Sequence, residues 1–192
     1  SEPVAQATLR IVKVFWGLSA SLAYKRHFPA IDWLISYSLY ADRLASWYAK
    51  NASSDFNELR AFAIHVLQEE AELEEIVRLV GADSLSYKDR LTLETAKSIR
   101  EDFLHQNAFH ETDTFTSVTK QCRMLRLIRD FHRLGLNALA AGADYSQLVN
   151  LPVREKIGRS KYIAEEEIAQ FDGIAEQLKR EIRALDGGES RV

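Results

Sequence analysis

The chain has 192 residues, 46% of them hydrophobic and 28% charged, which is ordinary for a globular domain large enough to bury a core. Its formal net charge of −3, with no basic stripe between aromatic residues, argues against a nucleic-acid binder, because such proteins need a positive field to displace counterions from phosphates. Only 8 Gly and 3 Pro are present, too few for the turns of a β-sandwich or barrel, so long helices are expected.

The single cysteine, Cys122, lies in a predicted helical run from Lys120 to Ile128 and has no partner for an internal disulfide. We expect it to be a packing residue in a protein of a reducing compartment. The sequence has no signal peptide and no run of roughly 18 apolar residues, so contact with a membrane is expected only through partner proteins.

The N-terminal residues Ala7 to Trp16 are rich in β-branched and aromatic side chains, which predicts a strand over Leu9 to Trp16. No other segment is predicted to be a strand. Because a lone strand leaves its backbone groups unpaired, we expect it to be an orphan left by a cut at a domain boundary, and to be displaced, disordered or paired with another copy. A short helix over Ser19 to His27 and a loop at Phe28-Pro29 follow.

From Ala41 onward, apolar residues recur at helical spacing, and start and stop signals divide the pattern into helices. The first predicted helix is short and runs from Asp42 to Lys50. A long helix follows, opened by Asp55 and Glu58 at capping-box spacing and ended by Gly81, and the next runs from Tyr87 to Gln106 with Ser86 as its cap. Another helix is predicted from Thr116 or Ser117 to Gly142, and a last one from Pro152 to about Leu185, with kinks allowed at Gly158 and Gly173. The predicted fold class is therefore all-α, a helical bundle with one orphan N-terminal β-strand.

The acidic run Glu69-Glu70-Ala71-Glu72-Leu73-Glu74-Glu75 suggests a metal-carboxylate bundle. Di-iron bundles, however, use Glu-x-x-His pairs that put both ligands on one inward face, and none of the 5 histidines has a glutamate three residues before it. We therefore interpret the run as a solvated helix face and predict no metal site.

Two enzymatic alternatives also lack their motifs. No glycine-rich phosphate loop occurs, and Gly158-Arg-Ser-Lys161 lies inside a predicted helix. Cys122 lies in a helix interior without a nucleophile elbow, and His65, in an apolar helical stretch, is expected to be a core or half-buried residue. By themselves these residues indicate only an α-helical domain without catalytic residues.

Four blocks of sequence, in order along almost the whole chain, resemble the catalytic A subunit of archaeal- and vacuolar-type rotary ATPases. The blocks are Ser1-Glu-Pro-Val4 followed by Thr8-Leu-Arg-Ile-Val-Lys-Val-Phe-Trp-Gly-Leu18, Lys25-Arg-His-Phe-Pro-Ala-Ile-Asp-Trp-Leu-Ile-Ser-Tyr-Ser38, Asp102-Phe-Leu-His-Gln-Asn-Ala-Phe109, and Leu151-Pro-Val-Arg-Glu-Lys-Ile157. The resemblance implies that residues 1–40 are the tail end of a nucleotide-binding domain. Residues 41–186 would be the C-terminal helical domain of the subunit, and residues 187–192 a flexible tail.

The resemblance also implies a site for the adenine of ATP or ADP. By block position its two aromatic walls are Phe28 and Phe109, with Pro29, Gln106, Asn107 and Ala108 at the pocket edge. The alternative for both phenylalanines is an ordinary core position. The phosphate loop, the catalytic carboxylate and the Mg ligands lie outside this chain, so the chain alone is expected to have no ATPase activity.

A second implied surface is the turn between the two long helices, which resembles a shaft-contacting loop of the related F-type β subunit. The implied rotor contacts are Ala82, Asp83, Ser84, Leu85, Ser86 and Tyr87. A plain capped interhelical turn is the alternative interpretation.

The implied partners are a B subunit in an alternating A3B3 ring and the central-stalk subunits of a proton- or sodium-translocating ATP synthase. Nucleic acid is not expected as a partner, and the implied location is cytoplasmic, peripheral on the cell membrane through the complex. The second interpretation is a free-standing helical interaction module without a nucleotide role, and the third is a helical-bundle enzyme.

Overall fold

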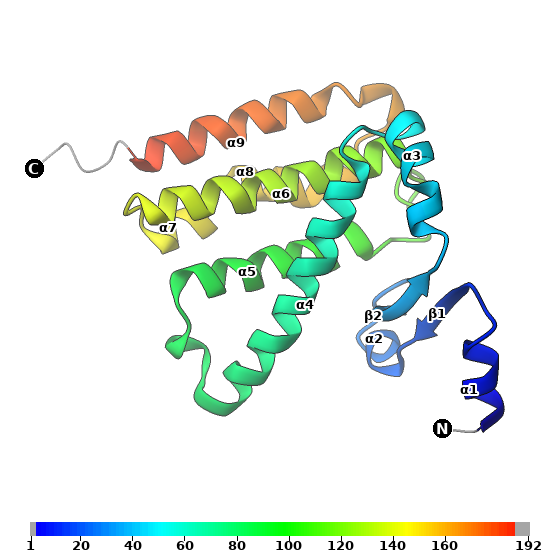
Figure 1. The fold of residues 1–192 in the computed structure, drawn as a ribbon. Coiled ribbons are helices and arrows are strands. Elements are labelled where there is room, and N and C mark those ends of the chain that lie inside the picture. Colours follow the sequence, from blue (N-terminus) through cyan, green and yellow to red (C-terminus); the bar gives the residue numbers. More distant parts are fainter. Residues whose placement is uncertain (1–2, 187–192) are drawn as a thin grey trace, which may run out of the picture.

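The chain is mostly helical with one small β-sheet, as Figure 1 shows, which confirms the predicted fold class in its main part. This computed structural model describes residues 3–186; the predicted tail at 187–192 and the first two residues lie outside that range. The elements are α1 (Pro3–Leu9), β1 (Val14–Leu18), α2 (Ala20–Tyr24), β2 (Ile31–Ser38), α3 (Ala41–Asn51), α4 (Phe56–Val80), the 3₁₀ turn η1 (Ala82–Ser84), α5 (Tyr87–Ser98), the π-helix η2 (Ile99–Leu104), α6 (Val118–Ala140), α7 (Tyr145–Val149), α8 (Val153–Arg159), the 3₁₀ turns η3 (Ser160–Tyr162) and η4 (Glu165–Glu167), and α9 (Gln170–Asp186).

The expectation of an orphan strand is wrong. Strand β1 pairs antiparallel with β2, with Val14 opposite Ser38 and Phe15 opposite Tyr37, and the register shifts before Gly17. Residues 31–38 alternate large apolar or aromatic side chains with other residues, a strand pattern that the sequence analysis overlooked. The strand also begins later than predicted, at Val14 and not at Leu9, and it ends at Leu18; residues 3–9 form a helix and 10–13 connect it to the strand.

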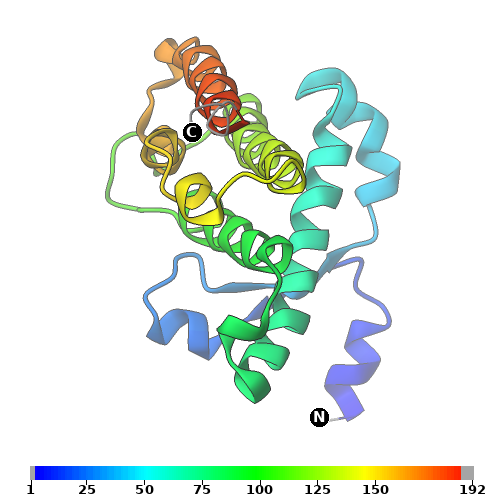
Figure 2. The same cartoon turned by 90° about the vertical axis from the view of Figure 1, so that its left-hand side faces the viewer.

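The hydrophobic core lies where α4, α5, α6 and α9 meet, and α6 runs between α5 and α9 (Figures 1 and 2). Deeply buried apolar side chains come from all four helices and from η2, which continues α5: Leu59, Val66, Leu91, Ile99, Ile128, Phe131 and Leu178. Each contributes roughly 1.5–3 kcal/mol through removal of its apolar surface from water. Cys122 is buried with them, in agreement with its predicted packing role.

Several helix ends follow the sequence signals. The hydroxyls of Ser86 and Ser117 accept hydrogen bonds from the backbone N–H groups of Asp89 and Lys120, and Gly81 ends α4 with a positive φ of 87°. The predicted capping role of Asp55 is wrong, because its side chain makes no cap hydrogen bond.

Asp55 instead joins α4 to α6. Its carboxylate accepts two hydrogen bonds from the Arg126 guanidinium, at 2.6 and 2.9 Å, and lies 3.4 Å from a nitrogen of Arg129. The hydrogen bonds from Arg126 hold the pKa of Asp55 well below its usual range, against the opposing effect of burial. A tertiary ion pair has thus taken the place of a local cap.

The predicted last helix is interrupted. Residues 160–169 leave the helical path through η3 and η4, and the separate helix α7 precedes α8. The break lets the Glu165 carboxylate accept hydrogen bonds at 2.9 and 2.8 Å from the backbone N–H and hydroxyl of Ser117, at the start of α6. Lys161 is also buried at this break, which local helical spacing does not reveal.

Candidate functional site

The two segments predicted to hold the adenine are hydrogen-bonded to each other. The backbone N–H of Gln106 donates to the carbonyl of Phe28 at 2.7 Å, and the N–H of Phe28 donates to Nδ1 of His105 at 3.1 Å. The side chain of Phe28 is half-exposed, with 50% of its surface accessible, and that of Phe109 is 99% exposed. One edge of the molecule therefore carries both segments, with their phenylalanines open to solvent.

The loop that presents Phe109 is closed by Asp113, which is buried. Its carboxylate accepts the Asn107 N–H at 2.6 Å, and its carbonyl accepts the side-chain amide of Gln106 at 2.8 Å. The side-chain oxygen of Asn107 in turn accepts the N–H of Phe109 at 3.1 Å, and the Ala108 carbonyl accepts a hydroxyl hydrogen bond from the same loop. The polar groups of the predicted pocket edge are therefore used to shape the loop, while the Phe109 ring is left free.

Histidines hold the other side of this edge. The buried ring of His27 faces the carbonyl oxygens of Pro29 and Arg100, at 3.2 and 3.0 Å from its two nitrogens. Burial lowers the pKa of His105, and the Lys161 ammonium and His27 lower it further. The neutral ring that results can accept the Phe28 N–H, which an imidazolium cannot.

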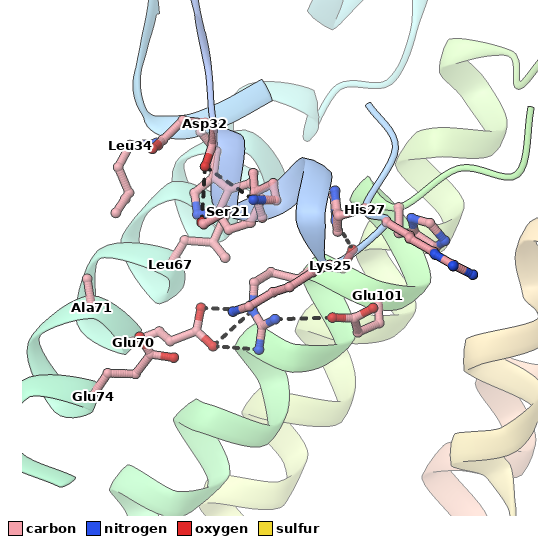
Figure 3. A pocket seen from close by; sticks show the side chains of 16 residues that line it. Ser21, Lys25, His27, Asp32, Leu34, Leu67, Glu70, Ala71, Glu74 and Glu101 are labelled. Carbon is pink, nitrogen blue, oxygen red and sulfur yellow. Dashed lines mark hydrogen bonds and ion pairs between the residues drawn. The ribbon is translucent and has the colours of Figure 1, made fainter. Parts of the chain in front are cut away.

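An ion pair anchors this region to α4 (Figure 3). The Nε of Arg100, in the π-helix η2, donates to both oxygens of Glu70 at 3.0 and 3.1 Å, and another guanidinium nitrogen contacts Glu101 at 3.1 Å. Glu70 is buried, so the prediction of a fully solvated acidic face is wrong at this residue. Burial raises the pKa of Glu70, and the neighbouring Arg100 opposes that rise.

A polar cavity of about 340 Å³ lies beside the ion pair, between the α2–β2 segment and helices α4 and η2. Figure 3 shows side chains from these segments around it, with His27 near one end and Glu70 and Glu74 at the other. His27 and His105 line this cavity as well as holding the Phe28 segment. The phenylalanine-bearing edge and the cavity therefore share a wall.

The predicted rotor turn lies at one end of the molecule, where α4 meets α5 (Figure 1). Ala82 begins η1, and Asp83, Ser84, Ser86 and Tyr87 are exposed. Leu85 is only 8% exposed, so its predicted role as a surface contact is wrong.

Local contacts fix the shape of this turn. Arg90 donates to the carbonyl oxygens of Leu85 and Asp83 at 3.2 and 2.8 Å. Leu79 and Val80, at the end of α4, are 80% and 64% exposed. Both lie beside the predicted contact residues in sequence, but the predicted set begins only at Ala82.

The structure also tests the expected positions of His65, of a metal site and of a membrane-spanning helix. His65 is exposed and lies 3.7 Å from Glu69, so the expectation of a core position is wrong. Among residues 3–186, no three His, Cys, Asp or Glu side chains gather as a metal site would require. None of the helices within the same range combines the length and hydropathy that crossing a bilayer demands.

Comparison with known protein families gives two matches along the chain. Residues 45–149 match the family model for the C-terminal domain of V and A type ATP synthase, and residues 1–38 match that for the ATP synthase alpha/beta family, nucleotide-binding domain. The chain belongs to the V and A type ATP synthase family.

Relatives within this family are long proteins. The V-type ATP synthase alpha chain of Acetivibrio thermocellus is 62% identical over 186 residues, which cover 96% of this chain and 32% of the relative. That of Thermoanaerobacter pseudethanolicus is 58% identical over 189 residues, covering 98% and 32%. The chain thus spans about a third of the length of the curated relatives it matches.

A solved structure has the same general fold. The ATP synthase subunit NeqB of Nanoarcheaum equitans superposes with a TM-score of 0.56 at 25% identity, covering 67% of this chain and 31% of that one. The match to the V and A type ATP synthase family agrees with the sequence resemblance and disfavours a free-standing interaction module.

Family blocks led the sequence analysis to the exposed phenylalanines but not to the groups that hold them. The residues it missed are His27, His105, Asp113 and Lys161. Their partners lie up to 77 residues away in sequence, so helical spacing carries no signal for them. His27 and His105 stand in the quoted family blocks and Lys161 in the fragment Gly158-Arg-Ser-Lys161, but none of them was given a role there.

Proposed function

We propose that this chain is the C-terminal part of the catalytic alpha chain of an ion-translocating V/A-type ATP synthase, and that it closes over the adenine of ATP. Residues 1–40 would finish the nucleotide-binding domain, and residues 41–186 would form the helical domain. The observation that carries the proposal is the 2.7 Å hydrogen bond from the Gln106 N–H to the Phe28 carbonyl. In a chain of the V and A type ATP synthase family, this bond joins two segments whose phenylalanines are exposed at one edge.

The chemistry of the edge fits a nucleobase. A base stacked on an aromatic ring gains roughly 1–3 kcal/mol and needs no particular hydrogen-bond pattern. Phe28 and Phe109 would supply the rings, and the loop closed by Asp113 keeps the second ring from collapsing onto the bundle. Such an arrangement suits a flat ligand bound from the solvent side.

The bound nucleotide would bring its Mg²⁺ and the phosphoryl group that is transferred, and the described residues of this chain fit only the base. Residues 3–186 contain neither a phosphate loop nor a cluster of acidic ligands. Phosphate and metal binding would therefore fall to the rest of the longer protein. Within this chain, the edge residues would orient the base and exclude water from one of its faces.

Motion of the helical domain would then reach a central stalk through the α4–α5 turn. Helix α4 has 25 residues, and at about 1.5 Å per residue it forms an arm roughly 37 Å long. Its exposed end and Asp83, Ser84, Ser86 and Tyr87 would contact the stalk. A B subunit in the alternating ring would complete each site, and the complex would lie on the cytoplasmic face of the cell membrane.

The adenine role is tested by Phe109→Ala in the full-length subunit, assembled in its complex. We expect the KM for ATP to rise about tenfold while kcat changes less than twofold, because stacking on the base is remote from the transferred phosphate. Phe115→Ala is the matched control, since this phenylalanine is 75% exposed and lies six residues further along. Equal KM values for wild type and Phe109→Ala would contradict the adenine assignment.

A further inference from the structure

The π-helix η2 ends with an unusual exchange of hydrogen-bond partners. Its last backbone bond runs from the His105 N–H to the Arg100 carbonyl at 2.8 Å, the five-residue step of a π-helix. The next bond of that series would join the Gln106 N–H to the Glu101 carbonyl. The Gln106 N–H instead donates to Phe28, so the Glu101 carbonyl needs another donor.

Lys161 supplies that donor. Its ammonium, at the break between α8 and α9, donates to the Glu101 carbonyl at 3.0 Å and to the His105 carbonyl at 2.7 Å. The residue is only 6% exposed. Backbone carbonyls at the end of η2 therefore bind its charge directly, and the Asp102 carboxylate interacts with it at longer range.

Two further contacts hold this lysine in place. Lys120, which is fully buried in α6, donates to the Lys161 carbonyl at 2.8 Å. Next to Lys161, the ring of Tyr162 lies 4.5 Å from the ring of His110, in the loop that carries Phe109. Burying two ammonium groups is costly in free energy, and burial lowers the pKa of Lys120 accordingly. The position of η3 is therefore tightly specified.

We propose that Lys161 is a positioning residue for the adenine edge: by binding the Glu101 carbonyl, it releases the Gln106 N–H to hold Phe28. This inference rests on the proposed function for its effect on ATP, but the hydrogen-bond exchange stands on its own geometry. Without the ammonium, the Gln106 N–H would return to Glu101, and Phe28 would keep only the bond from its N–H to the His105 side chain.

The structural part of the proposal is tested on the 192-residue chain by hydrogen exchange. In Lys161→Met, we expect amide protection to fall at Phe28 and in residues 105–110, while the core amides of α4 and α6 keep theirs. Lys161→Arg keeps a cationic donor and should retain most of the protection. Lys156→Met is the matched control, because that exposed lysine of α8 contacts only the side chain of Gln177. Loss of protection throughout the chain in Lys161→Met would assign the lysine to general stability and overturn the proposal.

The functional part is tested in the full-length subunit within its complex. We expect Lys161→Met to raise the KM for ATP about fivefold with kcat nearly unchanged, and Lys161→Arg to stay within twofold of wild type. Combined with Phe28→Ala, the Lys161→Met effect should largely disappear, because both changes remove the stacking of Phe28 on the base.

Failures of the two proposals give different patterns. A normal KM in Lys161→Met beside a raised KM in Phe109→Ala would overturn the positioning role and leave the adenine role intact. A normal KM in both variants, with protection still lost at Phe28, would overturn the adenine role and leave the hydrogen-bond exchange intact.

Discussion

The edge that carries Phe28 and Phe109 and the α4–α5 turn are both exposed, yet they are built in opposite ways. The edge depends on residues remote in sequence: Phe28 is held by His105 and Gln106, and the His105 carbonyl is held in turn by Lys161. The turn is held locally, by Ser86 at the start of α5 and by Arg90, which reaches back to Asp83.

This difference has a physical consequence for the two surfaces. A locally bonded turn keeps its shape as a unit at the end of a stiff helix, which suits a surface that transmits force. An edge assembled from segments remote in sequence keeps its shape only while the whole domain is folded, so its geometry can respond to changes elsewhere. The next three predictions test that contrast, from the largest expected effect to the smallest.

The largest effect is expected where the edge is anchored to α4. Glu70→Ala leaves a partly buried Arg100 with only the exposed Glu101 as a partner, which should destabilise the domain by about 2–4 kcal/mol. Urea unfolding followed by circular dichroism measures this. Glu72→Ala removes an exposed glutamate from the same helix and should cost at most about 0.5 kcal/mol. Equal stabilities for the two variants would mean that the ion pair does not anchor the edge.

A smaller effect is expected at the turn. Leu85→Ala removes a buried side chain of this turn and should cost about 2 kcal/mol, since its methyl groups leave a cavity. Leu79→Ala, at a site 80% exposed, should change stability by at most about 0.5 kcal/mol. The same unfolding measurement compares them. A larger loss in Leu79→Ala would indicate that the apolar end of α4, rather than Leu85, holds the turn.

The smallest effect concerns the pH dependence of stability at α5, the helix that follows the turn. His132 of α6 accepts or donates a 2.9 Å hydrogen bond to Thr95 of α5, and burial lowers its pKa to about 4. The unfolded chain, with an ordinary histidine pKa near 6.5, binds more protons between those values, so folding stability should fall as pH drops from about 6.5 to 4.

The measurement is the free energy of unfolding at pH 7 and pH 4.5. Since the side chain keeps some contact with solvent, we expect His132 to account for about 1–2 kcal/mol of the loss. The difference between wild type and His132→Gln isolates this share from the carboxylates that titrate over the same range. Parallel pH profiles for the two proteins would show that His132 does not carry it.

Particular elements show how far the sequence could be interpreted. The caps at Ser86 and Ser117 and the glycine stop at Gly81 were predictable because each depends on residues within four positions. The β1–β2 pair was missed because the β2 segment was considered only for its family resemblance. The interruption after α8 was missed because helical spacing continues through it, while the contacts that end the helix lie in α6 and η2.

The candidate site divides in the same way. Its phenylalanines came from a family resemblance, and their exposure agrees with an open edge; their contact with adenine stays a prediction. The groups that hold the edge, above all His105, Asp113 and Lys161, have no local signature, because a hydrogen bond to a backbone carbonyl can be made by many side chains.

By itself the sequence determined the helical class, the main helix boundaries, the family and the two segments that carry Phe28 and Phe109. These follow from periodicity, caps and motifs, which operate over a few residues or over contiguous blocks. Only the tertiary structure decided which polar groups are buried and with what partner: Asp55 with Arg126, Glu70 with Arg100, and Lys161 with the end of η2. The physical reason is that desolvation forces each buried polar group to find a partner, and the chain path alone brings that partner within reach.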